Sequence, residues 1–446
     1  MRLDILTNYK ESDKFSFKFF LPILIYFLLY FLFFLPTSAR IISYAIVYIS
    51  TSVGFIFLWR YLLTRNINMN YLYIMITIAI VIRIGVLFVH PTGSDDYYRY
   101  LWDGKVIANG INPYLYAPSD KVLDSLHSET LPLLVSFKDI KTIYPPLSLG
   151  MFYLSYIIGG ETFYGIKILL LLFELFTFLG IFLILKERNL PLKNIFLYAL
   201  APLPIFQFFV DSHIDVIGLT LLIFSIYFYL SHKKEWSLIF VGLSICVKPV
   251  GLILIPILFI TEKGIRAKIR TVLIPFIVCF LLYLPFILSI PLSEVFNALT
   301  NYTVNWTFNG FVFDIINSFL NDNQKARLIC GILFVIVFIP VLFSRKDFMD
   351  KIYLSVFLLL IFSPIVHPWY VTWLAVLLPL VPRWSGILYA NLVCLTAFTV
   401  VNYQLHGIWK DYPAVLLFEY VPVIIFFFYE LYFQKNKNIL QNLQSD

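Results

Sequence analysis

The sequence predicts an all-α protein, a polytopic bundle of about 12–14 membrane helices in which residues 1–446 form a single unit. Three observations lead to this prediction. Of the 446 residues, 60% are hydrophobic and only 13% are charged, whereas soluble domains carry about 25% charged residues. Apolar runs of roughly the length needed to cross a bilayer core recur along the chain. Lys and Arg lie mostly in short loops between these runs, so the net charge of +7 does not indicate a nucleic-acid partner.

Basic residues assign a side of the membrane to each loop. They place both termini in the cytoplasm: Arg2, Lys10, Lys14 and Lys18 near the N-terminus, Lys435 and Lys437 near the C-terminus. Five segments follow from this assignment: residues 1–89 with three N-terminal spans, 90–145 as an external loop, 146–290 with helices and short hairpins, 291–326 as a second external segment, and 327–446 with the C-terminal spans. We therefore expect a multi-pass protein of the cytoplasmic (inner) membrane, embedded in its lipids.

Two short apolar hairpins are expected within residues 146–290, each with a polar turn on the outer side. The first turn carries Asp211, His213 and Asp215, and the second carries Lys248. Irregular backbone at membrane depth is tolerated only where protein or a water-filled cavity surrounds it. The two turns are therefore expected to share a cavity. The run 147–159 is short for a span, and we expect it to dip into the membrane or to lie flat.

The external loop is too long for a simple connector and carries a cluster of charges. Four residues, Asp96, Arg99, Tyr100 and Asp103, follow at i, i+3, i+4 and i+7 and so share one face of a helix. Asp103 is expected to pair with Arg99 or Lys105. Asp95 precedes this helix and also fits the role of an N-cap. In the span before the loop, Arg83 is expected to snorkel or to pair with a carboxylate of the loop.

The ionisable residues expected on the outer side suit glycosyl transfer. This chemistry needs a carboxylate that deprotonates the acceptor hydroxyl, and Asp95 or Asp96 suits that role. It also needs cations that stabilise the departing phosphate, and Lys248 with Arg99 suits that role. Further residues are expected to bind substrate: Asp103, Tyr144, Asp211, His213, Asp215, His367 and Tyr370. The second external segment adds an aromatic and amide-rich run that contains Asn305 and Trp306.

Other readings of these residues remain open. Asp211, His213 and Asp215 have the spacing of metal ligands, but side chains two residues apart also serve as hydrogen-bonded turn residues, and a divalent metal is not favoured. His367 could serve only as a helix cap. A transporter or flippase of lipid-linked sugars is a second possible function, which predicts an inverted repeat and helices broken near the bilayer midplane. A third is a non-catalytic partner in surface-glycan assembly.

Several motifs resemble integral-membrane glycosyltransferases of the GT-C class, most closely bacterial and archaeal polyprenol-phosphate-mannose-dependent mannosyltransferase-like proteins. These motifs are Ser94-Asp-Asp-Tyr-Tyr-Arg-Tyr-Leu-Trp-Asp-Gly-Lys105, Gly110-Ile-Asn-Pro-Tyr114, Tyr144-Pro-Pro-Leu147, Lys248-Pro249 and His367-Pro-Trp-Tyr370. The resemblance covers roughly residues 70–380. Two features depart from the class: the acidic loop follows a third span rather than a first, and no extramembrane C-terminal domain for a large acceptor is evident.

The resemblance implies a function and an assignment of roles. It implies an inverting transferase that moves a hexose, with mannose the first choice, from a polyprenyl-phosphate-linked donor to a lipid or glycan acceptor on the outer face. In this class the first acidic residue of the loop is the expected base, which ranks Asp95 ahead of Asp96. Most members work without a catalytic metal, so no cofactor is expected.

Overall fold

The computed structural model describes residues 17–34, 39–65 and 67–443. The basic residues Arg2, Lys10 and Lys14, which predict a cytoplasmic N-terminus, lie outside the described residues. Within these ranges the chain is helical, and the only strand-like pairing is an isolated bridge between Phe308 and Ile365. The prediction of an all-α fold is confirmed.

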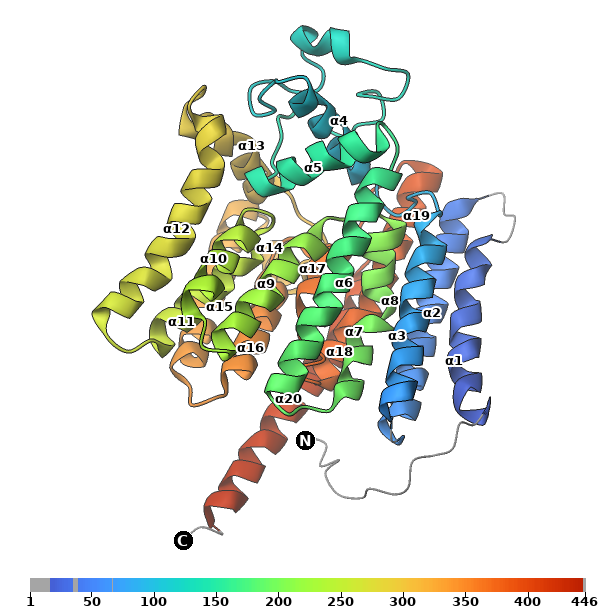
Figure 1. The fold of residues 1–446 in the computed structure, drawn as a ribbon, viewed down its shortest axis with the longest axis vertical. Coiled ribbons are helices and arrows are strands. Elements are labelled where there is room, and N and C mark those ends of the chain that lie inside the picture. The colour runs from blue at the N-terminus through green and yellow to red at the C-terminus, as the bar shows by residue number, and fades with distance from the viewer. Residues whose placement is uncertain (1–16, 35–38, 66, 444–446) are drawn as a thin grey trace.

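The helices follow one another with short turns, and one end of the bundle carries the long loop (Figure 1). The first half contains α1 (Phe17–Leu29), α2 (Arg40–Leu63), α3 (Met69–Leu87), α4 (Asp96–Ala108), α5 (Pro146–Gly159), α6 (Tyr164–Glu187), α7 (Phe196–Ala199), α8 (Pro202–Pro204), the π-helical turn η4 (Ile205–Val210) and α9 (Asp215–Leu230). The second half contains α10 (Lys234–Ile245), the 3-10 turn η5 (Pro249–Ile253), α11 (Leu254–Thr261), α12 (Ile265–Ile287), α13 (Leu292–Asn305), α14 (Phe311–Leu320), α15 (Asn323–Phe343), α16 (Phe348–Phe362), α17 (Pro368–Ala375), α18 (Trp384–Leu392), α19 (Ala397–His406) and α20 (Pro413–Leu443).

Seven helical segments of the described chain are long and apolar enough to cross a membrane, and the chain is a multi-pass membrane protein. They are α2, α3, α6, α12, α15, the segment Trp384–His406 and the first part of α20. An eighth span is possible as a broken helix, formed by Leu192–Ala199 and Pro202–Val210 with a bend of 46°. Ala201 is extended at the bend, because a residue that precedes proline avoids the helical region. The number of membrane helices predicted from the sequence, about 12–14, is larger because it also counted short hairpin arms such as α9 and α11.

The run 147–159 forms α5, which lies across the bundle beside α4 at the end that carries the loop (Figure 1). The two helices pack closely because Gly104 has no side chain: a Cβ there would lie 2.3 Å from the carbonyl oxygen of Phe152. The start of α5 is tied to the second polar turn. The Leu147 amide donates to the Cys246 carbonyl at 3.0 Å, and the Ser148 hydroxyl donates to the Val247 carbonyl at 2.9 Å.

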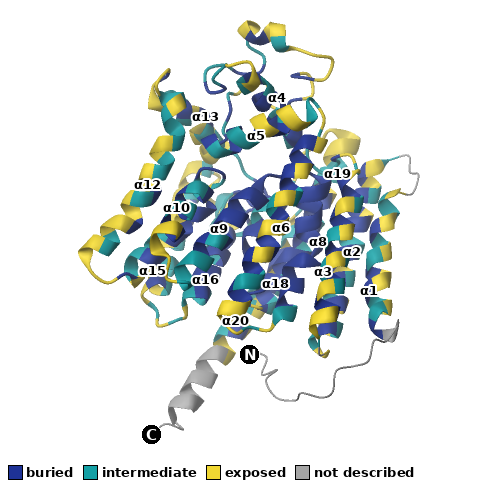
Figure 2. Cartoon of the chain, viewed as in Figure 1, coloured by how far each residue is buried: buried dark blue, intermediate teal, exposed yellow. Residues whose placement is uncertain are grey.

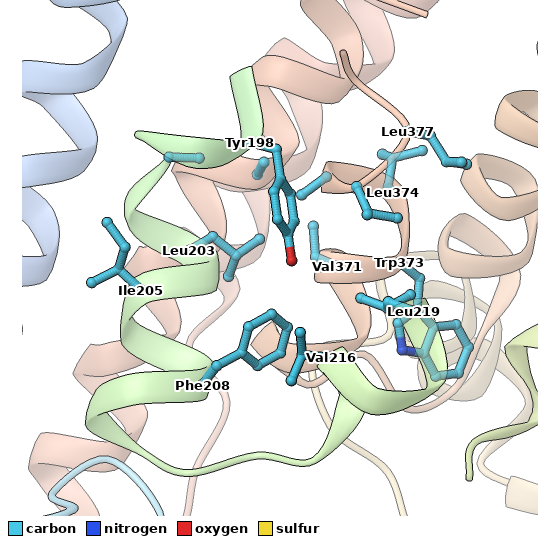
Figure 3. Packing of buried hydrophobic residues seen from close by; sticks show 14 of the residues in the cluster. Tyr198, Leu203, Ile205, Phe208, Val216, Leu219, Val371, Trp373, Leu374 and Leu377 are labelled. Atoms are coloured by element: carbon cyan, nitrogen blue, oxygen red, sulfur yellow. The ribbon is translucent and has the colours of Figure 1, made fainter. Parts of the chain in front are cut away.

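The core of the bundle lies among its central helices. Figure 2 shows buried residues concentrated in the middle, whereas α12 and α15 expose many side chains. Figure 3 shows side chains of α7 to α9 packed against those of α17, including Tyr198, Leu203, Phe208, Val216, Val371 and Leu374. The outer helices are apolar but little buried: only 11% of the α12 span is buried within the protein. Such a helix has its apolar surface toward lipid.

The prediction that Arg83 snorkels or pairs with a carboxylate of the loop is wrong. Arg83 neither snorkels nor reaches the loop; it is fully buried and pairs with Glu174 of α6 through Nη2 at 2.7 Å and Nε at 2.9 Å. Its Nη1 donates to the carbonyls of Ala79 and Ala199, and the Tyr198 hydroxyl donates to the other oxygen of Glu174 at 2.8 Å. Glu174 of α6 and carbonyls of α3 and α7 thus bind the guanidinium within the bundle, so the cation does not have to reach the membrane surface.

Removing one member of this pair should destabilise the protein strongly. In the Glu174→Leu variant, Arg83 keeps its charge but loses its counter-ion, and breaking a buried pair costs about 3–5 kcal/mol. Equilibrium unfolding of the purified protein in mixed detergent micelles measures the change. The exposed pair of Arg270 and Glu235 is the control: Glu235→Leu should change stability by about 1 kcal/mol or less. Equal effects of the two substitutions would contradict the role given to Glu174.

Candidate active site

The residues predicted from the two polar turns meet the start of α4 and the start of α17. Asp211 joins the turn to the loop before α4: it accepts hydrogen bonds from the Tyr44 hydroxyl and from the Gly93 amide, each at 2.7 Å. A Cβ on Gly93 would lie 2.4 Å from the Tyr44 hydroxyl oxygen, so only glycine allows this approach. Both oxygens of Asp211 are therefore occupied within the protein, and they fix the point from which the loop departs.

Asp96, the first residue of α4, faces the first polar turn. Its Oδ2 lies 3.7 Å from Nδ1 of His213. About a third (36%) of the Asp96 side chain is exposed, and protein surrounds the rest. Burial, reinforced by the charge of neighbouring Asp95, raises the pKa of Asp96 to about 7. The ring of His213 is 1% exposed, and neither of its nitrogens has a hydrogen-bond partner among the described residues. A buried ring nitrogen without a hydrogen-bond partner, Nδ1, therefore lies beside the Asp96 carboxylate.

The second polar turn supplies a cation beside the first. Lys248 Nζ lies 3.6 Å from Oδ2 of Asp215, and the Trp373 indole donates to Oδ1 of Asp215 at 2.8 Å. The ammonium also lies 5.5 Å from the ring centroid of Tyr144 and 5.7 Å from that of Tyr370. The Lys248 side chain is 13% exposed. The two turns therefore come together as expected, with a lysine enclosed by a carboxylate and two aromatic faces.

A stack of aromatic rings holds His213 in place. Trp369 lies between the two histidines: its ring centroid is 3.7 Å from that of His213 and 4.2 Å from that of His367. Phe308 stacks on the other face of His367 at 4.7 Å. His367 occupies the N-cap position of α17, but its side chain makes no capping hydrogen bond. The His367 ring packs between Trp369 and Phe308 instead, and stacked rings restrict one another's orientation.

Arg99 and Asp103 connect α4 to the end of the loop. Arg99 Nε donates to Asp103 Oδ1 at 2.9 Å, and Nη1 donates to the Ile140 carbonyl at 2.8 Å. The Thr142 hydroxyl donates to the other oxygen of Asp103 at 2.6 Å. The predicted pairing of Asp103 with Arg99 is confirmed, and Lys105 pairs instead with Glu161. The phosphate-binding role predicted for Arg99 remains a prediction; its Nη2 has no hydrogen-bond partner among the described residues.

Asp95 has different surroundings from Asp96. It is exposed, and the hydroxyl of Ser136, from the far part of the loop, donates to its Oδ2. Asp95 occupies the N-cap position of α4, yet its side chain makes no capping hydrogen bond. The alternative that Asp95 acts only as an N-cap is therefore not supported, since the contact that defines that role is missing.

Some residues of the site were missed by reasoning from the sequence. Trp369 and Trp373 carry no charge, and in a chain with 19% aromatic residues they do not stand out, although Trp369 lies within the His367-Pro-Trp-Tyr motif. Ser136, whose hydroxyl contacts Asp95, lies in no motif that would identify it from the sequence. Tyr302, whose hydroxyl lies 3.2 Å from that of Tyr370, lies close to the aromatic and amide-rich run. Such contacts become visible only when the fold is known.

The spacing typical of metal ligands does not produce a cluster. Asp211 faces α2, His213 faces Asp96, and Asp215 faces Trp373 and Lys248. Ser212 between them has a φ of 69°, so the backbone turns sharply and the side chains diverge. Among the described residues, no group of three or more His, Cys, Asp and Glu side chains is arranged to hold a metal ion.

Comparisons with known proteins identify the family. The model described as Alpha-(1->6)-mannopyranosyltransferase, N-terminal domain, matches residues 29–262, and the model described as MptB C-terminal domain matches residues 319–433. Comparisons with curated proteins and with solved structures gave no match. The first match covers more than half of the chain and contains Asp95, Asp96 and Lys248. The second match contains His367. The chain therefore belongs to the alpha-(1->6)-mannopyranosyltransferase family and is a membrane glycosyltransferase with a GT-C-like fold that transfers mannose.

Proposed function

We propose that the protein transfers mannose, with inversion, from a polyprenyl-phosphate-linked donor to a glycan or lipid acceptor on the outer face of the cytoplasmic membrane, with Asp95 as the general base. One observation carries this proposal: two consecutive carboxylates have different surroundings. The Asp95 side chain is exposed, whereas Asp96 faces His213 and interacts electrostatically with Lys248. Neighbouring carboxylates in unlike environments commonly take different catalytic roles.

Inversion favours Asp95 over Asp96 as the base. The acceptor oxygen attacks the anomeric carbon from the side opposite the departing phosphate, so the base and the phosphate-binding cation lie on opposite sides of the sugar. Asp96 is directed toward the Lys248 side of the site, and Asp95 is directed away, toward Ser136. The Ser136 hydroxyl occupies one oxygen of Asp95 and orients the other for the acceptor hydroxyl. A base within hydrogen-bond reach of that hydroxyl contributes about 10²–10⁴-fold to the rate.

The surroundings of Lys248 suit a phosphate that is attached to a lipid. Lys248 immediately precedes η5, and Leu252 on that turn is 51% exposed. The neighbouring helix α12 has most of its apolar surface outside the protein. A phosphate could thus lie at Lys248 while its polyprenyl chain stays in the bilayer. Lysine is a suitable ligand because its ammonium makes charge-assisted hydrogen bonds to phosphate oxygens.

The distribution of basic residues supports the outer face as the location of the site. The turns after α2, α6, α9, α11 and α15 lie at the end of the bundle opposite α4 and α5 (Figure 1). These turns carry a series of cations: Arg65, Lys186, Arg188, Lys233, Lys234, Lys263, Arg266, Arg345 and Lys346. Short loops rich in Lys and Arg remain in the cytoplasm. The aspartates, His213 and Lys248 would then face the exterior.

Loss of the Asp95 carboxylate should abolish most of the activity. We expect Asp95→Asn to lower kcat about 10²–10⁴-fold, measured as transfer of radiolabelled mannose from polyprenyl-phosphate-mannose by the purified full-length protein. Asp139 is a matched control, because it lies in the same loop, is exposed and also accepts from a serine hydroxyl, that of Ser119 at 2.7 Å; Asp139→Asn should retain activity. Full activity of Asp95→Asn together with loss in Asp96→Asn would make Asp96 the base.

Removal of the Lys248 charge should weaken the use of the donor. A hydrogen bond to a charged group contributes about 1.5–3 kcal/mol, so Lys248→Met should lower kcat/KM for the donor roughly 10- to 100-fold. The KM for the acceptor should change little. Lys105→Met, which removes a lysine paired with Glu161 in the same external region, is the control. An unchanged kcat/KM for the donor in Lys248→Met would show that the phosphate binds elsewhere.

Donor binding should depend on pH through Asp96. Its raised pKa of about 7 means that the carboxyl is mostly neutral below pH 7 and mostly ionised above it. Ionisation adds a negative charge near the Lys248 phosphate site, so the KM for the anionic donor should rise as pH increases from 6 to 8. Asp95, Asp215, Arg99, Lys248 and His213 also face this group. Asp96→Asn should flatten the dependence, and an identical pH profile in this variant would contradict the assignment.

A further inference from the structure

An exposed aromatic residue, Phe137, directly follows Ser136, whose hydroxyl contacts Asp95. Phe137 has a φ of 53°, and its side chain is 57% exposed. Bulky residues rarely adopt this left-handed conformation, and large apolar side chains in external loops are usually packed inward. Here the Phe137 ring meets Trp306, with ring centroids 4.6 Å apart and planes at 83°. The contact joins the loop to the end of α13, although the two residues are far apart in the chain.

Trp306 is held firmly from the other side. Arg327 of α15 donates to the carbonyl of Trp306 and, at 2.7 Å, to that of Thr303. The Trp306 ring stacks on Tyr302, with centroids 5.7 Å apart and planes at 30°. The Tyr302 hydroxyl in turn lies 3.2 Å from that of Tyr370, whose ring flanks Lys248. A series of contacts between aromatic residues thus leads from Lys248 through Tyr370, Tyr302 and Trp306 to Phe137.

The chemistry of this surface suits an uncharged sugar. Aromatic faces pack against the C–H groups of pyranose rings, and a rigid ring loses little conformational entropy on binding. Asn301 and Asn305, at i and i+4 on α13, are exposed; each side chain donates one hydrogen bond within the helix and has further polar positions for a ligand without adding charge. Sites for small ligands typically combine aromatic walls with a few polar groups that set orientation.

We propose that Phe137 and Trp306 form the platform that binds a mannose ring of the acceptor and presents its hydroxyl to Asp95. This inference rests on the proposed function and adds a binding subsite for the acceptor. The position of the pair supports it, because the Ser136 hydroxyl contacts Asp95 and the very next residue begins the platform. The platform joins the loop that carries Ser136 to the end of α13, and it is linked to Lys248 through Tyr302 and Tyr370.

The test compares acceptor and donor kinetics in the full-length protein. The probes are an octyl mannoside disaccharide with a (1→6) linkage as acceptor and radiolabelled polyprenyl-phosphate-mannose as donor. Phe137→Ala and Trp306→Ala should each raise the acceptor KM roughly tenfold and leave the donor KM unchanged. Trp306→Phe, which retains a ring, should restore most of the acceptor affinity. Calorimetric titration with the acceptor alone should show the same roughly tenfold rise in Kd.

Trp236 provides a matched control. It is 56% exposed in the first turn of α10, next to the basic turn at the opposite end of the bundle, so Trp236→Ala should leave the acceptor KM and Kd unchanged. The inference is overturned if both alanine variants keep the wild-type acceptor Kd. A lowered melting temperature with an unchanged Kd would identify the rings as membrane-interface anchors instead. If the wild type transfers no mannose, the proposed function fails, and the titration alone decides whether the acceptor platform exists.

Discussion

The carboxylate of Asp211 determines where the long loop before α5 leaves the bundle, and the arrangement of the site depends on it. It binds the Gly93 amide and the Tyr44 hydroxyl, so α2, the first polar turn and the start of the loop are joined at one point. The end of α3 is held nearby: Lys167 of α6 is fully buried and donates to the carbonyls of Leu87 and Val89. The last carbonyls of a helix lack partners within it, and lysine satisfies them here.

The different surroundings of Asp95 and Asp96 follow from their places at a helix start. Consecutive residues in a helix point in directions about 100° apart. Asp96 begins α4 and turns toward the bundle, where His213 lies, whereas Asp95 stands just before the helix and contacts the loop. Because α4 packs against α5 through Gly104 and is braced by Arg99 and Asp103, neither aspartate can exchange places without moving the whole helix. A local backbone feature thus gives two identical side chains different environments.

Local patterns in the sequence predicted local structure well. The i, i+4 spacing identified the pair of Arg99 and Asp103, and the apolar runs of the described chain coincide with helices. Partners far apart in the chain were not predictable: Arg83 pairs with Glu174, 91 residues away, and Trp373 with Asp215, 158 residues away. Periodicity describes the faces of one helix and carries no information about which helix lies next to it. The same limit explains why Trp373, whose indole binds Asp215, was not identified from the sequence.

The site balances its charges before any substrate arrives. An unpaired lysine in a poorly hydrated environment is costly, and Asp215 compensates Lys248 at 3.6 Å. The Trp373 indole in turn donates to Asp215, so this carboxylate has a second partner besides the lysine. In the proposed donor complex, the phosphate would compete with Asp215 for the ammonium, and the energetic gain would be only the difference between the two partners. The same competition would favour release of the polyprenyl phosphate that remains after mannose is transferred, because Asp215 is available to pair with the lysine again.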